Sequence, residues 1–400
     1  MSSYYKLPKN CFDLHLQPEC SNEKIKLYLS QSLHNYYNKM VVHILNMNTQ
    51  VDDFLQLYNT TQDISLNLDD LLRFVHPCDY VFSNIPGLKQ TVSKLNYKSN
   101  VFYELLEICN TVNLLDQYKS KNINSLHICK DSIETVECIN MFINGTCLNN
   151  NIKHVCMNSL DEIVNVYANV TLDSSIKKYD FIFCSVDMYN FNLNEKTPNH
   201  LNEYFLQLIQ IVILILKYQA QNGICVIKLG TTFHKPVIDI LFMLTTLFDK
   251  TFIIKPASSK ITTFEKYIVC KNFTDITSST ITTSVITTID TNKHMEILSK
   301  LYNFYYDYKL MMNSNKNQNI ISLLPNNLPY IFLNKMEDVN NILGQQQLEA
   351  IDQISNLMKN RNKEDKLEMM KKTNIQKSIH WCEKNKVPHN KFTDKTNIFL

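Results

Sequence analysis

The chain contains little glycine, only five of its 400 residues. It has no G-x-G-x-x-G and no Walker-type motif, which disfavours hydride transfer from a dinucleotide and nucleotide hydrolysis. It also lacks an excess of charge of one sign, because 40 basic residues are balanced by 38 acidic ones. Any nucleic-acid surface must therefore come from local clustering of basic residues.

Secretion, membrane insertion and zinc binding find little support. The N-terminus lacks the apolar core of a signal peptide. The most apolar run, Phe205–Leu216, is too short to cross a bilayer and contains Gln207 and Gln210. The twelve cysteines include no C-x-x-C pair, which favours buried thiols of a reducing, cytoplasmic compartment over a zinc site. We therefore expect no metal and no membrane association.

Hydrophobic periodicity divides the chain into three regions. Residues 1–95 have apolar residues at three- and four-residue spacing, as in Asn22–Met47 and Val51–Tyr58, which predicts an N-terminal helical region. Residues 96–275 alternate short β-branched or aromatic runs with longer periodic segments, which predicts an α/β domain with a mostly parallel sheet. Residues 276–400 are predicted to form a linker and a C-terminal helical region.

The linker and the C-terminal region have different compositions. Thr274–Thr291 is rich in Thr and Ser and predicts a loop or an irregular hairpin. Gln345–Lys386 combines an apolar stripe with Lys and Glu clusters, so it predicts an amphipathic helix or a pair of helices. Its basic residues are interspersed with acidic ones, which favours a solvated helix face over a nucleic-acid patch.

The α/β domain is expected to have a Rossmann-like arrangement. Its predicted strands are Ser125–Cys129, Lys153–Met157, Tyr179–Ser185, Gly223–Lys228, Thr251–Ile254 and Lys266–Cys270. Its predicted crossover helices are Ile133–Ile143, His200–Gln219 and Pro236–Phe248. Proline suits the first turn of the last of these helices, because its missing N–H would be unpaired there in any case.

Charged residues lie at the ends of three predicted strands. Asp187 follows one strand, Lys228 ends the next, and Glu265 precedes the last. Ligands bind at the carboxyl edge of open α/β sheets, so this location favours a functional site. Taken singly, Asp187 could be a helix N-cap and Lys228 a lysine that extends from a strand end to solvent. Together they favour a catalytic constellation.

The run from Tyr179 to Cys270 resembles the FtsJ-like family of S-adenosylmethionine-dependent RNA ribose 2′-O-methyltransferases. The resemblance lies in the order strand-Asp, long helix, Gly-strand-Lys, helix, Lys-Pro-x-Ser-Ser-basic, then Glu before a final strand. It is greatest to the FtsJ-like proteins of large cytoplasmic DNA viruses of the African swine fever virus type. It implies a Rossmann-like methyltransferase sheet, S-adenosyl-L-methionine as the cofactor, and RNA, including capped mRNA, as the substrate.

The resemblance also implies a Lys-Asp-Lys-Glu catalytic set. Lys228 would accept the proton of the ribose 2′-hydroxyl, and Asp187 and Glu265 would orient its amine. A lysine can act as such a base when burial lowers its pKa. The first lysine of the set is expected on the helix before the first strand, where the aligned position holds Val101. Lys98, about one helical turn earlier, is the candidate that replaces it.

The cofactor site is expected beside the first two strands. Its candidate residues are Cys129, Lys130, Asp131, Asn158 and Asp187. The family has a glycine-rich turn after the first strand, which lets the backbone approach the cofactor closely. This chain has Cys-Lys-Asp-Ser at that place, so side chains occupy the space where the family has glycine.

The RNA contact is expected on the loop before the last strand. Its candidates are Lys255, Ser258, Ser259 and Lys260, whose amines and hydroxyls could hold phosphates. On residue type alone, a solvated turn is an equally good interpretation.

Two functions follow from these residues. The first is an active RNA 2′-O-methyltransferase, favoured by the retained Asp187, Lys228 and Glu265. The second is a catalytically inactive, methyltransferase-like subunit that binds RNA or acts as a scaffold. The bulky cofactor turn favours this second function, because replacing glycine at such a turn is hard to compensate. The helical flanks are expected to pack on the core or to bind a protein partner.

Overall fold

The fold is given by a computed structural model. It describes residues 3–11, 13–57, 75–82, 91–95, 97, 99–119, 121–144, 152–158, 160, 177–185, 198–274, 290–313, 318–325, 327–359 and 364–390. The predictions for Lys98 and Asp187, and for most of the Thr/Ser-rich linker, fall outside these residues.

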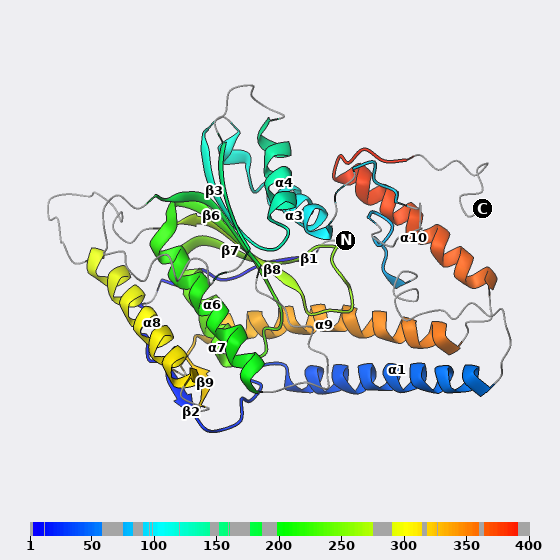
Figure 1. The fold of residues 1–400 in the computed structure, drawn as a ribbon, viewed down its shortest axis with the longest axis horizontal. Helices are drawn as coiled ribbons and strands as arrows, with labels where there is room; N and C mark the ends of the chain where they lie inside the picture. The colour runs from blue at the N-terminus through cyan, green and yellow to red at the C-terminus, as the bar shows by residue number, and fades with distance from the viewer. Residues whose placement is uncertain are drawn as a thin grey trace.

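A seven-stranded mixed sheet forms the centre of the molecule (Figure 1). Its strand order is β1-β7-β8-β6-β5-β3-β4. The strands β3, β4, β5 and β6 are parallel, whereas β8 lies antiparallel between β6 and β7. Their bounds are β1 Ser3–Lys6, β3 Ile123–Ile128, β4 Ile152–Met157, β5 Tyr179–Ser185, β6 Gln219–Leu229, β7 Phe248–Lys255 and β8 Lys266–Phe273. This arrangement confirms the predicted Rossmann-like α/β class.

The middle of β5, Phe181–Cys184, is apolar because both faces of the sheet are covered. In β5, Phe181 and Phe183 point into the core on one face, and Ile182 and Cys184 into the core on the other. This alternation follows from the two-residue period of a strand. All four side chains are fully buried.

Helices cover the two faces of the sheet as separate layers. One layer contains α6 (Pro198–Tyr218), α7 (Lys235–Leu247) and α8 (Asp290–Asn313). The other contains α3 (Asn100–Thr111), α4 (Ser132–Asn144) and α10 (Glu364–Lys384), with the short 3-10 helix η1 (Asp116–Tyr118) after α3. The three crossover helices expected from the sequence, α4, α6 and α7, are therefore present within two residues of their predicted bounds.

Helix α6 contains the most apolar run of the chain. Residues His200–Tyr218 are long and apolar enough to span a membrane, but most of this stretch is buried inside the protein. It packs against the sheet and against α8. The burial is typical of a core helix, as its glutamines indicated: Gln210 is buried and donates a hydrogen bond of 2.6 Å to the Tyr305 hydroxyl.

The N-terminal region is not purely helical, which corrects the expectation for residues 1–95. Strand β1 extends the central sheet by pairing antiparallel with β7. A second strand, β2 (Glu19–Ser21), pairs with β9 (Asn319–Ser322) in a small separate sheet. Short strands carry too little periodicity to be recognised from sequence, and their pairing with distant segments is a tertiary effect.

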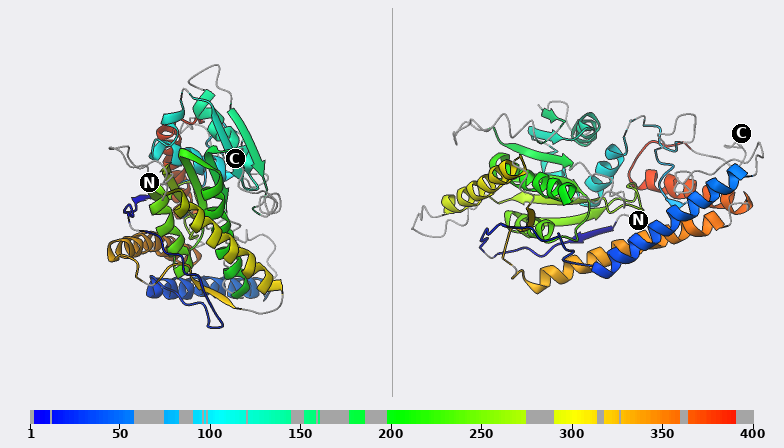
Figure 2. Two further views of the ribbon diagram at one scale, coloured as in Figure 1. Left: turned by 90° about the vertical axis from the view of Figure 1, so that its left-hand side faces the viewer. Right: turned by 60° about the horizontal axis from the view of Figure 1, so that its bottom comes forward.

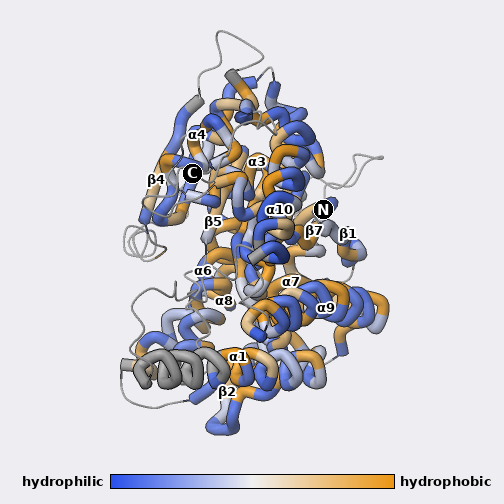
Figure 3. Tube along the Cα trace, turned by 90° about the vertical axis from the view of Figure 1, so that its right-hand side faces the viewer, coloured by the Kyte–Doolittle hydropathy of each residue, from blue (hydrophilic) through white to orange (hydrophobic). Residues whose placement is uncertain are grey.

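Two long helices lie side by side along one side of the molecule (Figures 2 and 3). They are α1 (Gln31–Leu57) and α9 (Tyr330–Lys359). The helical segments expected at Asn22–Met47 and Val51–Tyr58 belong to one continuous helix, α1, which begins at Gln31 and ends at Leu57. The C-terminal segment forms a pair of helices, α9 and α10, as one of the two predicted alternatives.

Candidate active site

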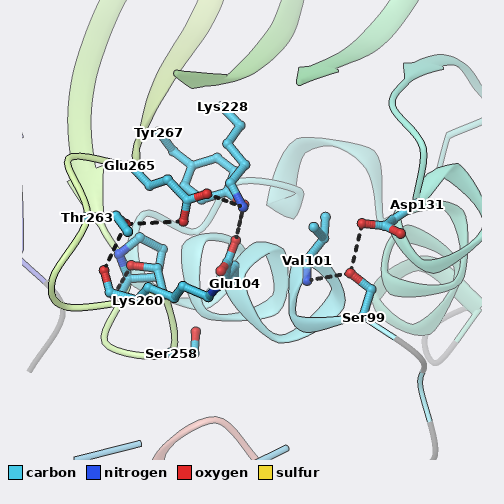
Figure 4. A network of polar contacts seen from close by, with 12 residues as sticks. Ser99, Val101, Glu104, Asp131, Lys228, Ser258, Lys260, Thr263, Glu265 and Tyr267 are labelled. Carbon is cyan, nitrogen blue, oxygen red and sulfur yellow. Dashed lines mark hydrogen bonds and ion pairs between the residues drawn. The ribbon is translucent and has the colours of Figure 1, made fainter. Parts of the chain in front are cut away.

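Lys228 lies between two carboxylates at the carboxyl edge of the sheet (Figure 4). Its Nζ atom is 3.0 Å from Oε2 of Glu104 and 3.7 Å from Oε1 of Glu265. The side chain of Lys228 is 12% exposed, and that of Glu104 only 3%. The structure thus brings together the predicted pair Lys228 and Glu265 and adds Glu104, which the sequence did not indicate.

Strand register explains how this cluster is assembled. Lys228 is the second last residue of β6 and pairs across the sheet with Tyr267 of β8. Glu265 directly precedes β8, so it lies at the same edge. Glu104 comes from α3, which covers this face, and it accepts a hydrogen bond from the buried Tyr267 hydroxyl. The Lys228 ammonium also lies 5.6 Å from the centre of the Tyr267 ring.

The two carboxylates change the acid–base behaviour of Lys228. Burial by itself lowers the pKa of the Lys228 amine, but Glu104 and Glu265 outweigh it and raise this pKa above its ordinary value. Opposite charges stabilise the ammonium form. The expectation of a lysine with a lowered pKa is therefore wrong. Near neutral pH, Lys228 is an ammonium group paired with Glu104 and Glu265.

The helix expected to carry the first lysine has no cation in the described part of its first turn. Helix α3 begins after Ser99, whose hydroxyl accepts a hydrogen bond from the Val101 N–H at 3.2 Å. Val101 is 9% exposed and precedes Glu104 by three residues, so the two side chains lie on the same face of α3. The side chain one turn before Glu104, the ion-pair partner of Lys228, is therefore the apolar Val101 (Figure 4).

The predicted cofactor turn follows β3. Cys129 is buried and its N–H donates to the Met157 carbonyl, whereas Lys130 is exposed. The carboxylate of Asp131 accepts a hydrogen bond of 2.9 Å from the Ser99 hydroxyl, which ties the turn to the start of α3. Asn158, just after β4, is exposed.

These groups match the polar parts of S-adenosylmethionine in type. A carboxylate at the end of β3 can hold an ammonium group, and an exposed amide after β4 can bind ribose hydroxyls. The described turn contains no glycine, so its contacts would come from side chains rather than from a close backbone approach.

A buried polar network connects β3 with the start of α4, on the two sides of this turn. His127 of β3 lies 2.8 Å from the Ser125 hydroxyl and 2.8 Å from the Thr135 hydroxyl at the start of α4. Burial, with a smaller contribution from His154, lowers the pKa of His127 to about 3. His127 is therefore a neutral structural residue.

The predicted RNA loop is held tightly by the protein itself. The Lys255 ammonium donates to the carbonyls of Lys260, Thr263 and Glu265 at 2.7–3.0 Å. Ser258 donates its hydroxyl to Glu107, and Ser259 donates to the Pro256 carbonyl. Of the four candidates, only the Lys260 side chain is exposed, and the hydrogen bonds of the other three are made within the protein.

Glu107 is a second carboxylate of α3 that sequence reasoning missed. It is 3% exposed and accepts hydrogen bonds from the N–H groups of Ala257 and Ser258, at 2.9 and 3.1 Å. It also accepts one from the indole N–H of Trp381 on α10, at 2.9 Å. The available signal was the spacing of Glu104 and Glu107, which puts two acidic residues one turn apart on an otherwise apolar helix.

A Rossmann-like sheet with a charged cluster at its carboxyl edge defines the class of this domain. Residues 97–273 match the FtsJ-like methyltransferase family. This segment contains Lys228, Glu104, Glu265 and both candidate loops, and it leaves the N-terminal and C-terminal regions outside.

The chain is similar to a crystal structure of a protein assigned as a ribosomal RNA methyltransferase in Plasmodium falciparum, with 18% sequence identity and a TM-score of 0.30. The similarity covers 44% of this chain and 98% of that one. No curated protein matches this chain.

Proposed function

We propose that this protein is an S-adenosylmethionine-dependent RNA 2′-O-ribose methyltransferase, with capped mRNA as its substrate. The observation that carries the proposal is the Lys228 ammonium between Glu104 and Glu265 at the edge of an FtsJ-like domain. A cation fixed by two carboxylates has a defined direction, and it can place a ribose hydroxyl by donating a hydrogen bond to its oxygen.

The proposed chemistry depends on the protonation state of Lys228. Bound S-adenosylmethionine would supply an activated methyl group. Lys228 as an ammonium can orient the 2′-hydroxyl but cannot take its proton, so the base form must first be generated by loss of a proton. Because Glu104 and Glu265 raise the pKa of Lys228, methyl transfer is expected to be slow at neutral pH and to accelerate as the pH rises.

Specific observations favour a second function, that of an inactive methyltransferase-like subunit that binds RNA or a protein. Lys228 is held in the form that cannot accept a proton. Val101 occupies the helix position where the family resemblance places a lysine. The turn after β3 carries side chains in place of glycine. These three features together favour a protein that keeps the methyltransferase fold without methyl-transfer activity.

The deciding experiment combines calorimetry with methyl transfer. S-adenosylmethionine is titrated into the full chain with and without capped RNA, and transfer of a labelled methyl group is followed between pH 7 and pH 10. Lys228→Ala is compared with Lys300→Ala, which changes an exposed lysine of α8.

Saturable cofactor binding, with transfer lost only in Lys228→Ala, supports the enzyme. Absence of cofactor binding in both titrations eliminates the enzyme and leaves the second function, an inactive subunit that binds RNA or a protein.

A further inference from the structure

A cavity of about 400 Å³ is lined in part by the loop that borders the Lys228 site. Its walls come from the loop Lys255–Ile261, from part of α9 and part of α10, and from Val75, Pro77 and Cys78. This volume lies within the roughly 300–1,000 Å³ of small-molecule sites. Lys228, Glu104 and Glu265 are not among the residues that line this cavity.

The cavity walls are fixed by the buried Glu107. Its carboxylate binds the N–H groups of Ala257 and Ser258 on one wall and the Trp381 indole of α10, the helix that forms another wall. Hydrogen bonds to an ionised acceptor in a buried position are strong. The cavity is therefore preformed, which removes the cost of ordering its walls when a ligand binds.

The lining combines apolar surfaces with amide groups. Pro256, Ile261 and Met370 contribute apolar surface, and Gln346, Gln347 and Gln353 contribute side-chain amides. Gln347 is 3% exposed and donates to the Thr263 carbonyl, while its Oε1 has no hydrogen-bond partner among the described residues. This Oε1 atom is buried away from the cavity, so the amides that a ligand can contact are those of Gln346 and Gln353.

The cavity and the Lys228 site share one wall. Lys255 lines the cavity, and its ammonium donates to the carbonyl of Glu265, whose carboxylate is 3.7 Å from Lys228. At the cavity, Lys377 of α10 adds an exposed ammonium. A ligand with a flat apolar face, N–H donors at its edge and an attached phosphate fits this combination.

We propose that the cavity binds a nucleobase of the RNA strand, from a nucleotide other than the one that is methylated. This inference rests on the proposed function for the choice of RNA, and it extends that function to a specificity site. Amide side chains can hydrogen-bond to base edges, the apolar surface can pack against the base face, and the Lys377 ammonium can form an ion pair with the phosphate.

Trp381 provides a direct measurement. It is the only tryptophan of the chain, it is 5% exposed, and it is hydrogen-bonded to the residue that fixes the cavity walls. Its fluorescence is followed during titration with AMP, GMP, CMP and UMP, and then with a short capped RNA.

The variants are Ala350→Phe, which fills the cavity from α9, and Gln353→Leu, which removes an amide at an exposed position and keeps its size. The control is Ile342→Phe at a 44% exposed position of the same helix. Circular dichroism and thermal melting establish that each variant is folded.

The expected result is a saturable fluorescence change with at least one mononucleotide, and RNA affinity about tenfold weaker in Ala350→Phe and Gln353→Leu, as for loss of one bound base. Ile342→Phe should bind like the original chain. Unchanged RNA affinity in the folded cavity variants would overturn the proposal, as would a response to a peptide or protein partner but to no nucleotide.

The same titrations with Lys228→Ala separate the two proposals. Nucleotide binding by both the original chain and Lys228→Ala, with no methyl transfer by the original chain, leaves the cavity site standing and removes the enzyme. Methyl transfer that proceeds with unchanged RNA affinity in Ala350→Phe removes only the cavity site.

Discussion

The Glu104 carboxylate lies 3.0 Å from the Lys228 ammonium and at the same time accepts a hydrogen bond from the Tyr267 hydroxyl. This buried contact connects α3 with β6 and β8, and it fixes both the position and the charge of the lysine. Removing only one partner of an ion pair buried this deeply strongly destabilises the folded protein. Glu104 is therefore expected to influence both the stability of the domain and the pH dependence of its activity.

Replacing Glu104 by Gln should lower the pKa of Lys228, because one of the two carboxylates that raise it loses its charge. Under the proposed function, the rise in methyl-transfer rate with pH should then occur at lower pH. The measurement is a single-turnover rate profile from pH 7 to pH 10. Glu296→Gln, an exposed change on α8, is the control, and an unaltered profile in Glu104→Gln would show that Lys228 is not the titrating base.

Replacing Val101 by Lys should place a cation on the face of α3 that carries Glu104. A second ammonium lowers the pKa of Lys228 by like-charge repulsion and competes for Glu104. The transfer rate at pH 7.5 should rise about tenfold or more, as for recovery of a general base. Val101→Met, which adds length without charge, should leave the rate unchanged, and equal rates for the two variants would contradict this reasoning.

Replacing Glu107 by Gln should destabilise the fold by about 2–3 kcal/mol, since a buried charged acceptor loses its charge and one oxygen becomes a donor. The new amide N–H would face donors of Ala257, Ser258 or Trp381. Urea denaturation followed by Trp381 fluorescence gives the free energy of unfolding. Glu368→Gln on an exposed position of α10 should change it by less than about 0.5 kcal/mol.

Acid should destabilise the protein through His127. The unfolded chain binds a proton at this residue near pH 6.5, but the folded chain does so only near pH 3. Between these values the unfolded state binds more protons, so the free energy of unfolding should fall by about 1.4 kcal/mol for each unit that the pH drops below 6.5. His127→Leu should reduce this slope in denaturation curves measured between pH 7 and pH 4.5. A slope equal to that of the original chain would assign the effect to other groups.

The sheet and its crossover helices were predictable because their signals are local. Strand β5 contains the apolar run Phe181–Cys184, and α7 has Pro236 in its first turn, where a proline is tolerated. Strand β1 could not be predicted, because its four residues are ordered only by pairing with β7, which lies more than 240 residues away in the sequence. The same holds for β2 and β9.

Two residues of the charged cluster, Lys228 and Glu265, were predictable from the sequence, whereas Glu104 and the electrostatics of the cluster were not. Lys228 and Glu265 stand out because each lies beside a strand end, whereas Glu104 is one acidic residue among the apolar residues of α3. Likewise, Lys255 and Ser258 have the residue types of a phosphate-binding loop, but the folded loop uses both side chains internally. Residue type states what a side chain can donate, and only packing decides which acceptor it meets.

The sequence by itself determined the order of strands and helices within the α/β domain, the Rossmann-like class and the family resemblance of this domain, because periodicity and turn residues act within a few residues. The tertiary structure alone decided that Lys228 is a cation, since its pKa depends on two carboxylates brought to it from α3 and from the start of β8. It also decided that Glu107 and Trp381 join three segments around one cavity. Charge interactions and burial depend on distance in space, which the order of residues does not contain.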